Sequence, residues 1–361
     1  MKMPENKRNA EDVQRKTEAG WGNEVEKTGE AERGKEAERT REQKQAVSPA
    51  FALVCQEWLA ESAAMVKEST CAQYRVYARK HLLPCFGDWP VHEITTQALK
   101  QFVQCKLNEN QYPDMPTYSV NTVRLILSIL KLILGYARTK GYELDPKLSF
   151  PRIQECFRER RVVFSVEEQT RLTKYLDVCP NIDAVGILLS LYTGLRVGEI
   201  CALRWDAVDL VNRRLQIRYT MQRISDFDAQ SVRKTKVVLS RPKSRKSERE
   251  VPIPLFLVEK LYRIRPRDPH AYLLTGSSDI YLEPRTLENR FHRYARGCDL
   301  PRVHFHMCRH SFATRCLERG VDIKTLSEIL GHSSVKITLD RYAHSSFDLK
   351  LTNMDKLTFL N

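Results

Sequence analysis

The pattern of apolar and polar positions predicts a polar leading segment followed by two folded domains. Residues 1–47 are almost entirely polar, and Trp21 is the only aromatic residue among them. Such a composition buries too little apolar surface to offset the entropy of an ordered chain, so we expect a disordered, charged lead. Apolar residues then recur at helical spacing over 51–65, 69–83, 95–107 and 119–140. This spacing predicts a small all-helical domain over residues 48–145.

A second domain is predicted over residues 163–345, after a linker over 146–162. Ser165 and Glu168 form a capping box at the start of a helix, and Gly194 ends an apolar helix over 183–193. Alternating apolar residues over 214–221, 237–240 and 249–254 predict a small antiparallel sheet, and four more helices follow, over 286–296, 306–319, 323–330 and 335–342. The predicted fold class is therefore mainly α with a small antiparallel β-sheet (α+β).

The positive charge of the chain lies in these folded domains. Lys and Arg number 59 against 45 Asp and Glu, which gives a net charge of +14. Residues 1–46 contain 11 residues of each sign, so the excess lies beyond them. A basic folded body points to a polyanionic partner, and nucleic acid is the leading candidate.

Other features of the composition bear on location and cofactors. The chain opens on charged residues, which argues against a secretory signal. Its most apolar segments fall short of the roughly 18 apolar residues of a membrane span. Ten cysteines occur without a Cys-x-x-Cys pair, which fits a reducing cytoplasm. A metal site at His304, His306, Cys308 and His310 is the alternative, but alternate-residue spacing on a helix does not match common zinc patterns. We expect a cytoplasmic protein with no membrane segment, metal or cofactor.

Two basic features precede the last helices. Arg196 lies just past the helix break at Gly194, where it can face a cleft, and Glu199 on the next turn can hold it, although most pairs at this spacing are surface pairs. Residues 233–249 then contain eight basic residues and one acid, and the turn between strands places Lys243 at the tip of a hairpin. A general phosphate-attracting patch is the plain alternative.

Histidines accompany the last helices. His306 and Arg309 share one face at a helix start, where both can grip an anion, although a histidine there is more often a cap or a core residue. His332 caps one helix and Tyr342 ends the next, ten residues later. The alternative is a helix-turn-helix that enters the major groove, in which Tyr342 is a core or phosphate-contacting aromatic residue.

Other basic residues are candidates for contacts with a DNA backbone, although a solvated charged face explains the helical ones equally well. They lie on the second predicted helix, where Tyr74, Tyr77 and His81 accompany them, and around the predicted hairpin: Arg75, Arg79, Lys80, Arg241, Arg245 and Lys246.

Taken together and in this order, these motifs resemble the tyrosine recombinase (phage integrase) family over residues 48–350. The resemblance consists of Thr193-Gly-Leu-Arg196-x-x-Glu199, Lys243, His306-x-x-Arg309-His310, Leu330-Gly-His332 and Tyr342. It implies a helical core-binding domain and a mixed catalytic domain that clamp DNA between them. Met307 and Cys308 depart from the residues more common there, which affects local packing only, and the lead does not look like the arm-binding domain of many integrases.

The resemblance also implies roles for the residues. Tyr342 is the nucleophile, and Arg196, Arg309 and His332 bind the phosphate and stabilise its charge without a metal. Lys243 protonates the departing 5'-hydroxyl, and His306 accepts the tyrosine proton or orients the phosphate. Glu199 supports the residues that contact the phosphate. A 3'-phosphotyrosyl bond stores the energy of the broken link.

The implied function is that of a site-specific recombinase, an integrase of a mobile element, which acts as a homotetramer on two double-stranded DNA sites, and a directionality factor is a candidate further partner. The tail over 346–361 carries Phe347, Leu351 and Met354 at helical spacing; it can pack on its own domain or, by family likeness, dock onto a neighbouring subunit. Two rivals are a type IB topoisomerase, which shares the chemistry, and a helix-turn-helix repressor, which leaves Arg196 and Lys243 without a shared purpose.

Overall fold

The computed structural model describes residues 48–108, 117–154, 163–228, 231, 233–241, 247–300, 302–342 and 354. The chain divides into two compact units between Cys156 and Phe157. This division falls inside the segment predicted as a linker. The lead over residues 1–47 lies outside the described residues, as does the tail apart from Met354.

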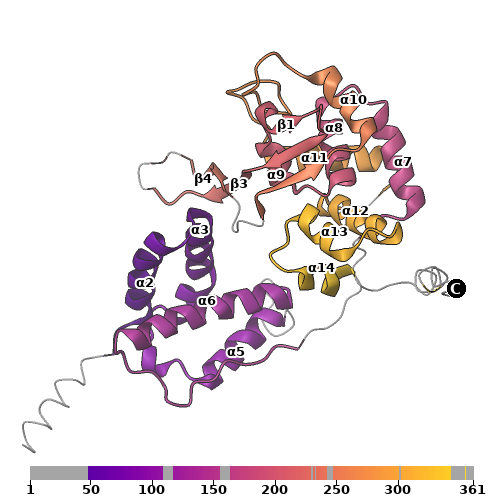
Figure 1. Ribbon diagram of the computed structural model, residues 1–361. Coiled ribbons are helices and arrows are strands. Elements are labelled where there is room, and N and C mark those ends of the chain that lie inside the picture. Colours follow the sequence, from indigo (N-terminus) through magenta and orange to yellow (C-terminus); the bar gives the residue numbers. More distant parts are fainter. Residues whose placement is uncertain are drawn as a thin grey trace, which may run out of the picture. The chain divides into compact units, whose positions relative to one another are not determined.

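The first unit is helical, as predicted (Figure 1). Its elements are α2 (Phe51–Met65), α3 (Glu68–Tyr77), the π-helical turn η1 (Ala78–Leu82), α4 (Leu83–Phe86), the 3-10 turn η2 (Val91–Glu93), α5 (Thr96–Leu107) and α6 (Val120–Thr139). Thr95 and Ser119 cap α5 and α6, because their side chains accept hydrogen bonds from backbone N–H groups three residues on.

The helix predicted over residues 69–83 differs in detail. It begins at Glu68 without a side-chain cap, and it widens after Tyr77 into the π-helical turn before α4. Pro84 explains the change, because proline has no N–H to donate to the carbonyl of Lys80, four residues earlier.

Helix α6 forms the centre of the first unit. Eight of its side chains are buried and pack with α2, α5 and the π-helical turn, from Val123 to Ala137. Its 20 residues are long and apolar enough to cross a membrane, so the expectation that no run reaches that length was wrong. The buried side chains show that this apolar surface is used in the core.

The second unit consists of helices around two small sheets (Figure 1). Its helices are α7 (Val166–Asp177), α8 (Ile182–Thr193), α9 (Val197–Ala202), the 3-10 turn η4 (Trp205–Ala207), α10 (Leu255–Ile264), α11 (Pro284–Gly297), α12 (His306–Glu318), α13 (Ile323–Leu330) and α14 (Val335–Tyr342). The predicted capping box is confirmed at α7, where Ser165 and Glu168 exchange hydrogen bonds. Nearly every side chain of α8 is buried, so the core is built around this helix.

Among the described residues the strands form two antiparallel sheets, where a single sheet was predicted. Strands β1 (Val208–Asp209), β2 (Arg214–Ile217) and β5 (Arg249–Pro252) make one sheet, and β3 (Thr220–Ser225) pairs with β4 (Thr235–Ser240) in the other. The predicted strand over 214–221 is therefore broken between Ile217 and Thr220. Its two halves have different partners.

This pairing corrects the predicted hairpin around Lys243. Strand β4 pairs with β3 and strand β5 pairs with β2, so the segment between β4 and β5 joins two sheets and is not the tip of a hairpin. The error arose because alternation identifies strands but not their partners.

Candidate active site

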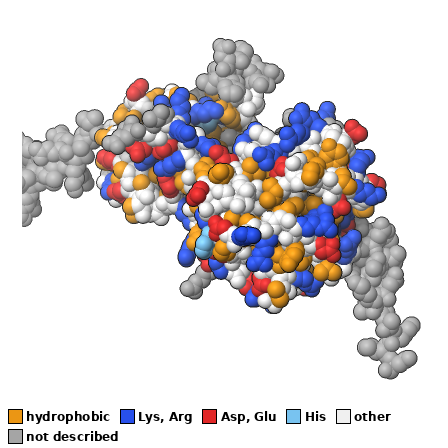
Figure 2. All heavy atoms as spheres, turned by 90° about the horizontal axis from the view of Figure 1, so that it is seen from above, with side chains coloured by type: hydrophobic (Ala, Val, Ile, Leu, Met, Phe, Trp, Pro, Cys, Tyr) orange, Lys and Arg blue, Asp and Glu red, His pale blue; other side chains and the backbone are white. Residues whose placement is uncertain are grey.

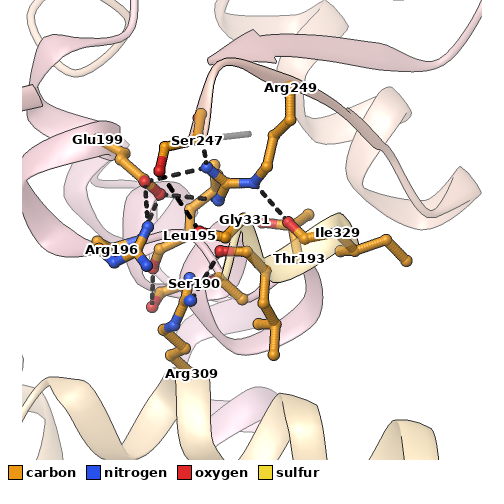
Figure 3. A network of polar contacts seen from close by, with 12 residues as sticks. Ser190, Thr193, Leu195, Arg196, Glu199, Ser247, Arg249, Arg309, Ile329 and Gly331 are labelled. Carbon is orange, nitrogen blue, oxygen red and sulfur yellow. Dashed lines mark hydrogen bonds and ion pairs between the residues drawn. The ribbon is translucent and has the colours of Figure 1, made fainter. Parts of the chain in front are cut away.

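An arginine pair enclosing one carboxylate forms the first part of the site (Figure 3). Arg196 lies at the start of α9, and its Nη1 donates to Oε1 of Glu199 at 2.7 Å. Arg249, on β5, donates from Nη2 to Oε2 of the same carboxylate at 3.0 Å and from Nη1 to Oε1 at 3.1 Å. Arg196 is 37% exposed, whereas the side chains of Arg249 and Glu199 are 6% and 3% exposed. The buried pair therefore supports an arginine that still reaches the surface.

The electrostatics of Glu199 follow from this enclosure. Burial alone raises the pKa of a carboxyl group, but Arg249 and then Arg196 outweigh it and lower the pKa of Glu199 to about 2. Glu199 also accepts a hydrogen bond from the backbone N–H of Arg196 at 2.9 Å. It is thus ionised at neutral pH and fixes both the main chain and the side chain of Arg196.

Arg309 forms the second part of the site. It lies in α12, is 2% exposed, and donates from Nη1 to the carbonyl of Gly194 at 2.6 Å and from Nη2 to the carbonyl of Leu330 at 2.7 Å. The same Nη2 lies 3.1 Å from Nε2 of His332. These contacts fix the orientation of the guanidinium and join α12 to the turns after α8 and α13. Arg196 lies two residues after Gly194, which forms one of these turns, so the two arginines belong to one network of polar contacts.

Two glycine turns allow these contacts. Gly194 ends α8 with φ +70°, and Gly331 ends α13 with φ +64°, a left-handed conformation that favours glycine. A Cβ at Gly194 would lie 2.6 Å from the ring of Phe312, and one at Gly331 would lie 2.9 Å from the side chain of Arg249. Both turns therefore need glycine for conformation and for space.

The helix predicted to carry the nucleophile follows directly. Helix α14 ends at Tyr342, and His332 lies in the turn before it. Nδ1 of His332 is 2.8 Å from Oγ1 of Thr338 on α14. The Tyr342-bearing helix is thereby joined to the histidine that contacts Arg309, although the Tyr342 side chain itself lies outside the described residues.

The other predicted residues are distributed differently. His306, the first residue of α12, is exposed, does not cap the helix, and stacks edge to face with His310 at 4.5 Å between ring centroids. Lys243, Arg245 and Lys246 lie outside the described residues, and Arg241 is exposed just after β4. Among the described residues, no group of three or more His, Cys, Asp or Glu side chains could hold a metal ion.

In the first unit, the predicted basic helix separates into buried and exposed positions. Arg79 and Lys80 are exposed on the π-helical turn, and Arg75 is partly buried. His81 is 4% exposed, and burial, followed by the charges of Lys106 and Lys80, lowers its pKa to about 4. A buried neutral histidine of this kind serves the core, whereas Arg79 and Lys80 can meet a ligand.

Basic side chains are not confined to the site. Figure 2 shows Lys and Arg spread over much of the visible surface, with acidic and apolar side chains between them. Shape and charge alone therefore do not single out one anion-binding surface.

Sequence reasoning missed two residues of the network. Arg249 appeared only as one of eight basic residues in a run, and Thr338 was not singled out. Each acts through a partner distant in the chain or across a turn, Glu199 for the first and His332 for the second. The glycine turn before Thr338 was the one local signal that a contact back to His332 could form.

Comparison with known proteins identifies the family. Residues 163–348 match the model of the phage integrase family, and residues 50–107 match the phage integrase N-terminal SAM-like domain. The first match covers more than half of the chain and contains every residue of the network described above. The chain belongs to the phage integrase family.

Similar proteins include recombinases and transposases. A tyrosine recombinase XerC-like protein of Caldanaerobacter subterraneus is 29% identical over 248 residues, which cover 63% of each chain. Tyrosine recombinase XerA of Thermococcus onnurineus is 29% identical over 61% of this chain and 70% of its own. The transposase from transposon Tn916 of Enterococcus faecalis is 28% identical over 47% of this chain and 44% of its own. The matches thus span from under half to about two thirds of these relatives.

Solved structures share the fold. The Tn1549 transposon integrase in complex with transposon right end DNA has a TM-score of 0.66 at 19% identity, covering 84% of this chain and 98% of that one. A lambda integrase tetramer bound to a Holliday junction has a TM-score of 0.59 at 18% identity, covering 84% and 80%. At these identities the likeness establishes the fold, which is α+β with a helical N-terminal unit, as predicted.

Proposed function

We propose that the chain is a site-specific DNA recombinase, an integrase of a mobile element, that cleaves and rejoins DNA through a 3'-phosphotyrosyl intermediate on Tyr342. One observation carries the proposal. Two arginines, Arg196 at the start of α9 and Arg309 on α12, are oriented by a single network that also holds His332 and the helix ending at Tyr342. Membership of the phage integrase family supports this chemistry.

The proposed reaction uses the residues as follows. A phenol has a pKa near 10, so roughly one tyrosine in a thousand is ionised at pH 7, and attack on a phosphodiester needs activation and charge stabilisation. Arg196 and Arg309 would bind the two non-bridging oxygens, and His332 would donate a third hydrogen bond. The Glu199–Arg249 pair keeps Arg196 in place. The fixed orientation of the two arginines lowers the barrier because their side chains are already held in place by the protein before the reaction.

Proton transfer is assigned to two further residues. Lys243 would protonate the departing 5'-hydroxyl, and His306 would accept the tyrosine proton or orient the phosphate. The exposure of His306 at the start of α12 leaves it accessible to a substrate. The reaction would need no metal or nucleotide, since the phosphotyrosyl bond retains the energy of the broken link.

The partners would be double-stranded DNA and further copies of this chain in the cytoplasm. The net charge of +14 and the exposed Arg79 and Lys80 favour contact with a DNA backbone, to which Arg75, Arg241, Arg245 and Lys246 would add. A tetramer on two sites, with the tail docked on a neighbouring subunit, is the proposed assembly, and a directionality factor would choose between integration and excision. Deletion of residues 346–361 should abolish pairing of two DNA sites and spare binding to one, as measured by gel mobility shift. Unchanged pairing would contradict this role of the tail.

Trapping the covalent intermediate tests the proposed chemistry. The substrate is a nicked DNA that loses a short fragment after cleavage, taken from the DNA that flanks the gene. The wild-type chain should form a covalent protein–DNA species resistant to denaturation, and Tyr342→Phe should form none. Tyr262→Phe is the matched control, because Tyr262 is 70% exposed on α10 and lies outside the network.

The outcomes separate the rival functions. Covalent species on the flanking DNA only, formed through Tyr342, support a site-specific recombinase. Relaxation of plasmids that lack this DNA would instead indicate a type IB topoisomerase. Tight binding of the DNA without any covalent species would indicate a helix-turn-helix repressor and overturn the proposal.

A further inference from the structure

Helix α14 is attached to the second unit in an unusual way. Among residues 335–339 its buried side chain is the polar Thr338, 1% exposed, whereas Val335, Ile337 and Leu339 are 42%, 38% and 46% exposed. An amphipathic helix normally buries its apolar residues and exposes its polar ones. The contact of Thr338 with His332 is therefore a principal anchor of this helix.

The neighbours of His332 determine which of its nitrogens carries the proton. Nε2 faces Nη2 of Arg309 at 3.1 Å, and Nδ1 faces Oγ1 of Thr338 at 2.8 Å. A guanidinium has donors only, so Nε2 must accept from Arg309. A neutral imidazole then carries its proton on Nδ1 and donates it to the hydroxyl of Thr338.

This arrangement is opposite to the one that the reaction needs. To donate a hydrogen bond to a phosphate oxygen, His332 must carry a proton on Nε2. A phosphate that takes up the Arg309 guanidinium would remove the reason for Nε2 to accept. The proton on Nδ1 can then pass to water while Nε2 takes one from water, so that the imidazole stays neutral and no proton is gained or lost.

We propose that Thr338 is a positioning residue whose hydroxyl reverses its hydrogen bond to His332 when an oxyanion binds, which allows the histidine to change tautomer without moving. A hydroxyl can accept from Nδ1–H before the change and donate to Nδ1 after it. The same hydrogen bond ties α14 to His332 in both states. The inference rests on the proposed function, since it assumes that the anion binds against Arg309 and His332.

Nuclear magnetic resonance of the full chain with ¹⁵N-labelled histidine tests this directly. Long-range nitrogen–proton correlations report which ring nitrogen carries the proton, and the signals of His332 are those lost in His332→Gln. The probe is sulfate, an oxyanion that does not itself titrate near neutral pH. The free wild-type chain should show a proton on Nδ1, and added sulfate should move it to Nε2.

Two substitutions of Thr338 give the matched comparison. Thr338→Ser keeps the hydroxyl and should retain both states, whereas Thr338→Val keeps the shape but removes the hydroxyl, and the His332 proton should then stay on Nδ1 when sulfate is added, because no hydroxyl can donate to Nδ1. Amide hydrogen exchange in α14 should also be about fivefold faster in Thr338→Val, the effect of one lost hydrogen bond. Leu339→Ala, on an exposed neighbour, should change neither measurement.

The results decide between two separate failures. A proton on Nε2 in the free wild-type chain, no change with sulfate, or identical spectra for Thr338→Val and the wild type would overturn the role of Thr338. None of these measurements uses DNA or Tyr342. A chain that shows the tautomer change but forms no covalent DNA species would keep this inference and lose the proposed recombinase activity.

Discussion

Replacement of Arg249 by methionine probes the buried ion pair behind Arg196. Methionine keeps much of the length of the side chain and removes its charge, so Glu199 keeps a single ionic partner, Arg196. Loss of one partner from a buried pair typically costs about 3–5 kcal/mol. Because Arg196 remains 2.7 Å from the carboxylate, we expect about 3 kcal/mol, the lower end of that range.

The pH dependence of this loss has a definite sign. The pKa of Glu199 is about 2 in the folded chain, below the ordinary value of 4.5, so its ionisation stabilises the fold above pH 4.5 and loses this effect as pH falls towards 2. Without Arg249, burial raises the pKa of Glu199 against the charge of Arg196 alone. The difference in stability between wild type and variant should therefore be largest at neutral pH and shrink as pH falls through this window.

Urea unfolding followed by circular dichroism measures the effect. The control is Arg285→Met, because the Arg285 side chain is 74% exposed in its pair with Glu288 and should contribute less than about 1 kcal/mol. The double variant Arg249→Met with Glu199→Gln should recover part of the lost stability, since no buried charge is then left with too few partners. A loss below about 1 kcal/mol at neutral pH, or a loss independent of pH, would refute the reasoning.

Two further predictions concern a turn and a buried histidine. Gly194→Ala should lower the free energy of unfolding by more than the roughly 1 kcal/mol of a left-handed alanine, because its Cβ would also meet Phe312 at 2.6 Å. Gly276→Ala, with φ +67° and open space around it, should show the backbone cost alone. Equal losses of stability for the two variants in urea unfolding would argue against a steric role. His81→Leu should flatten the pH dependence of the stability of the first unit. The pKa of His81 is about 4 in the folded chain and 6.5 ordinarily, so the wild type should lose stability as pH falls from 6.5 to 4 in unfolding experiments. An identical slope of stability against pH in the variant would contradict this.

Local signals in the sequence located most of the elements. The capping box at Ser165 and the glycine at 194 each depend on residues a few positions apart, and the structure has a helix end at each. The ordered motifs also predicted that Arg196, Arg309 and His332 share a site, and the structure joins them in one hydrogen-bonded network. The helix ends follow from short-range geometry, whereas the shared site was implied only by the family resemblance.

Features that depend on distant partners were not predictable in the same way. Arg249 pairs with Glu199 across 50 residues, and nothing near it distinguishes it from the other basic residues of its run. The alternation over 214–221 indicated one strand, but the two halves bind different strands. Burial of the polar Thr338 in place of its apolar neighbours also opposes the usual helical pattern. Each of these depends on the whole fold and on the chemistry of the site.

The separate pairing of β4 and β5 has a consequence for how the protein can diversify. Since each strand keeps its own partner, residues inserted into or removed from the connection between them would leave both registers intact. The connection is also rich in positive charge. Natural variants or engineered libraries can therefore change the length of this connection at little risk to folding, provided that Lys243, the proposed proton donor, is kept.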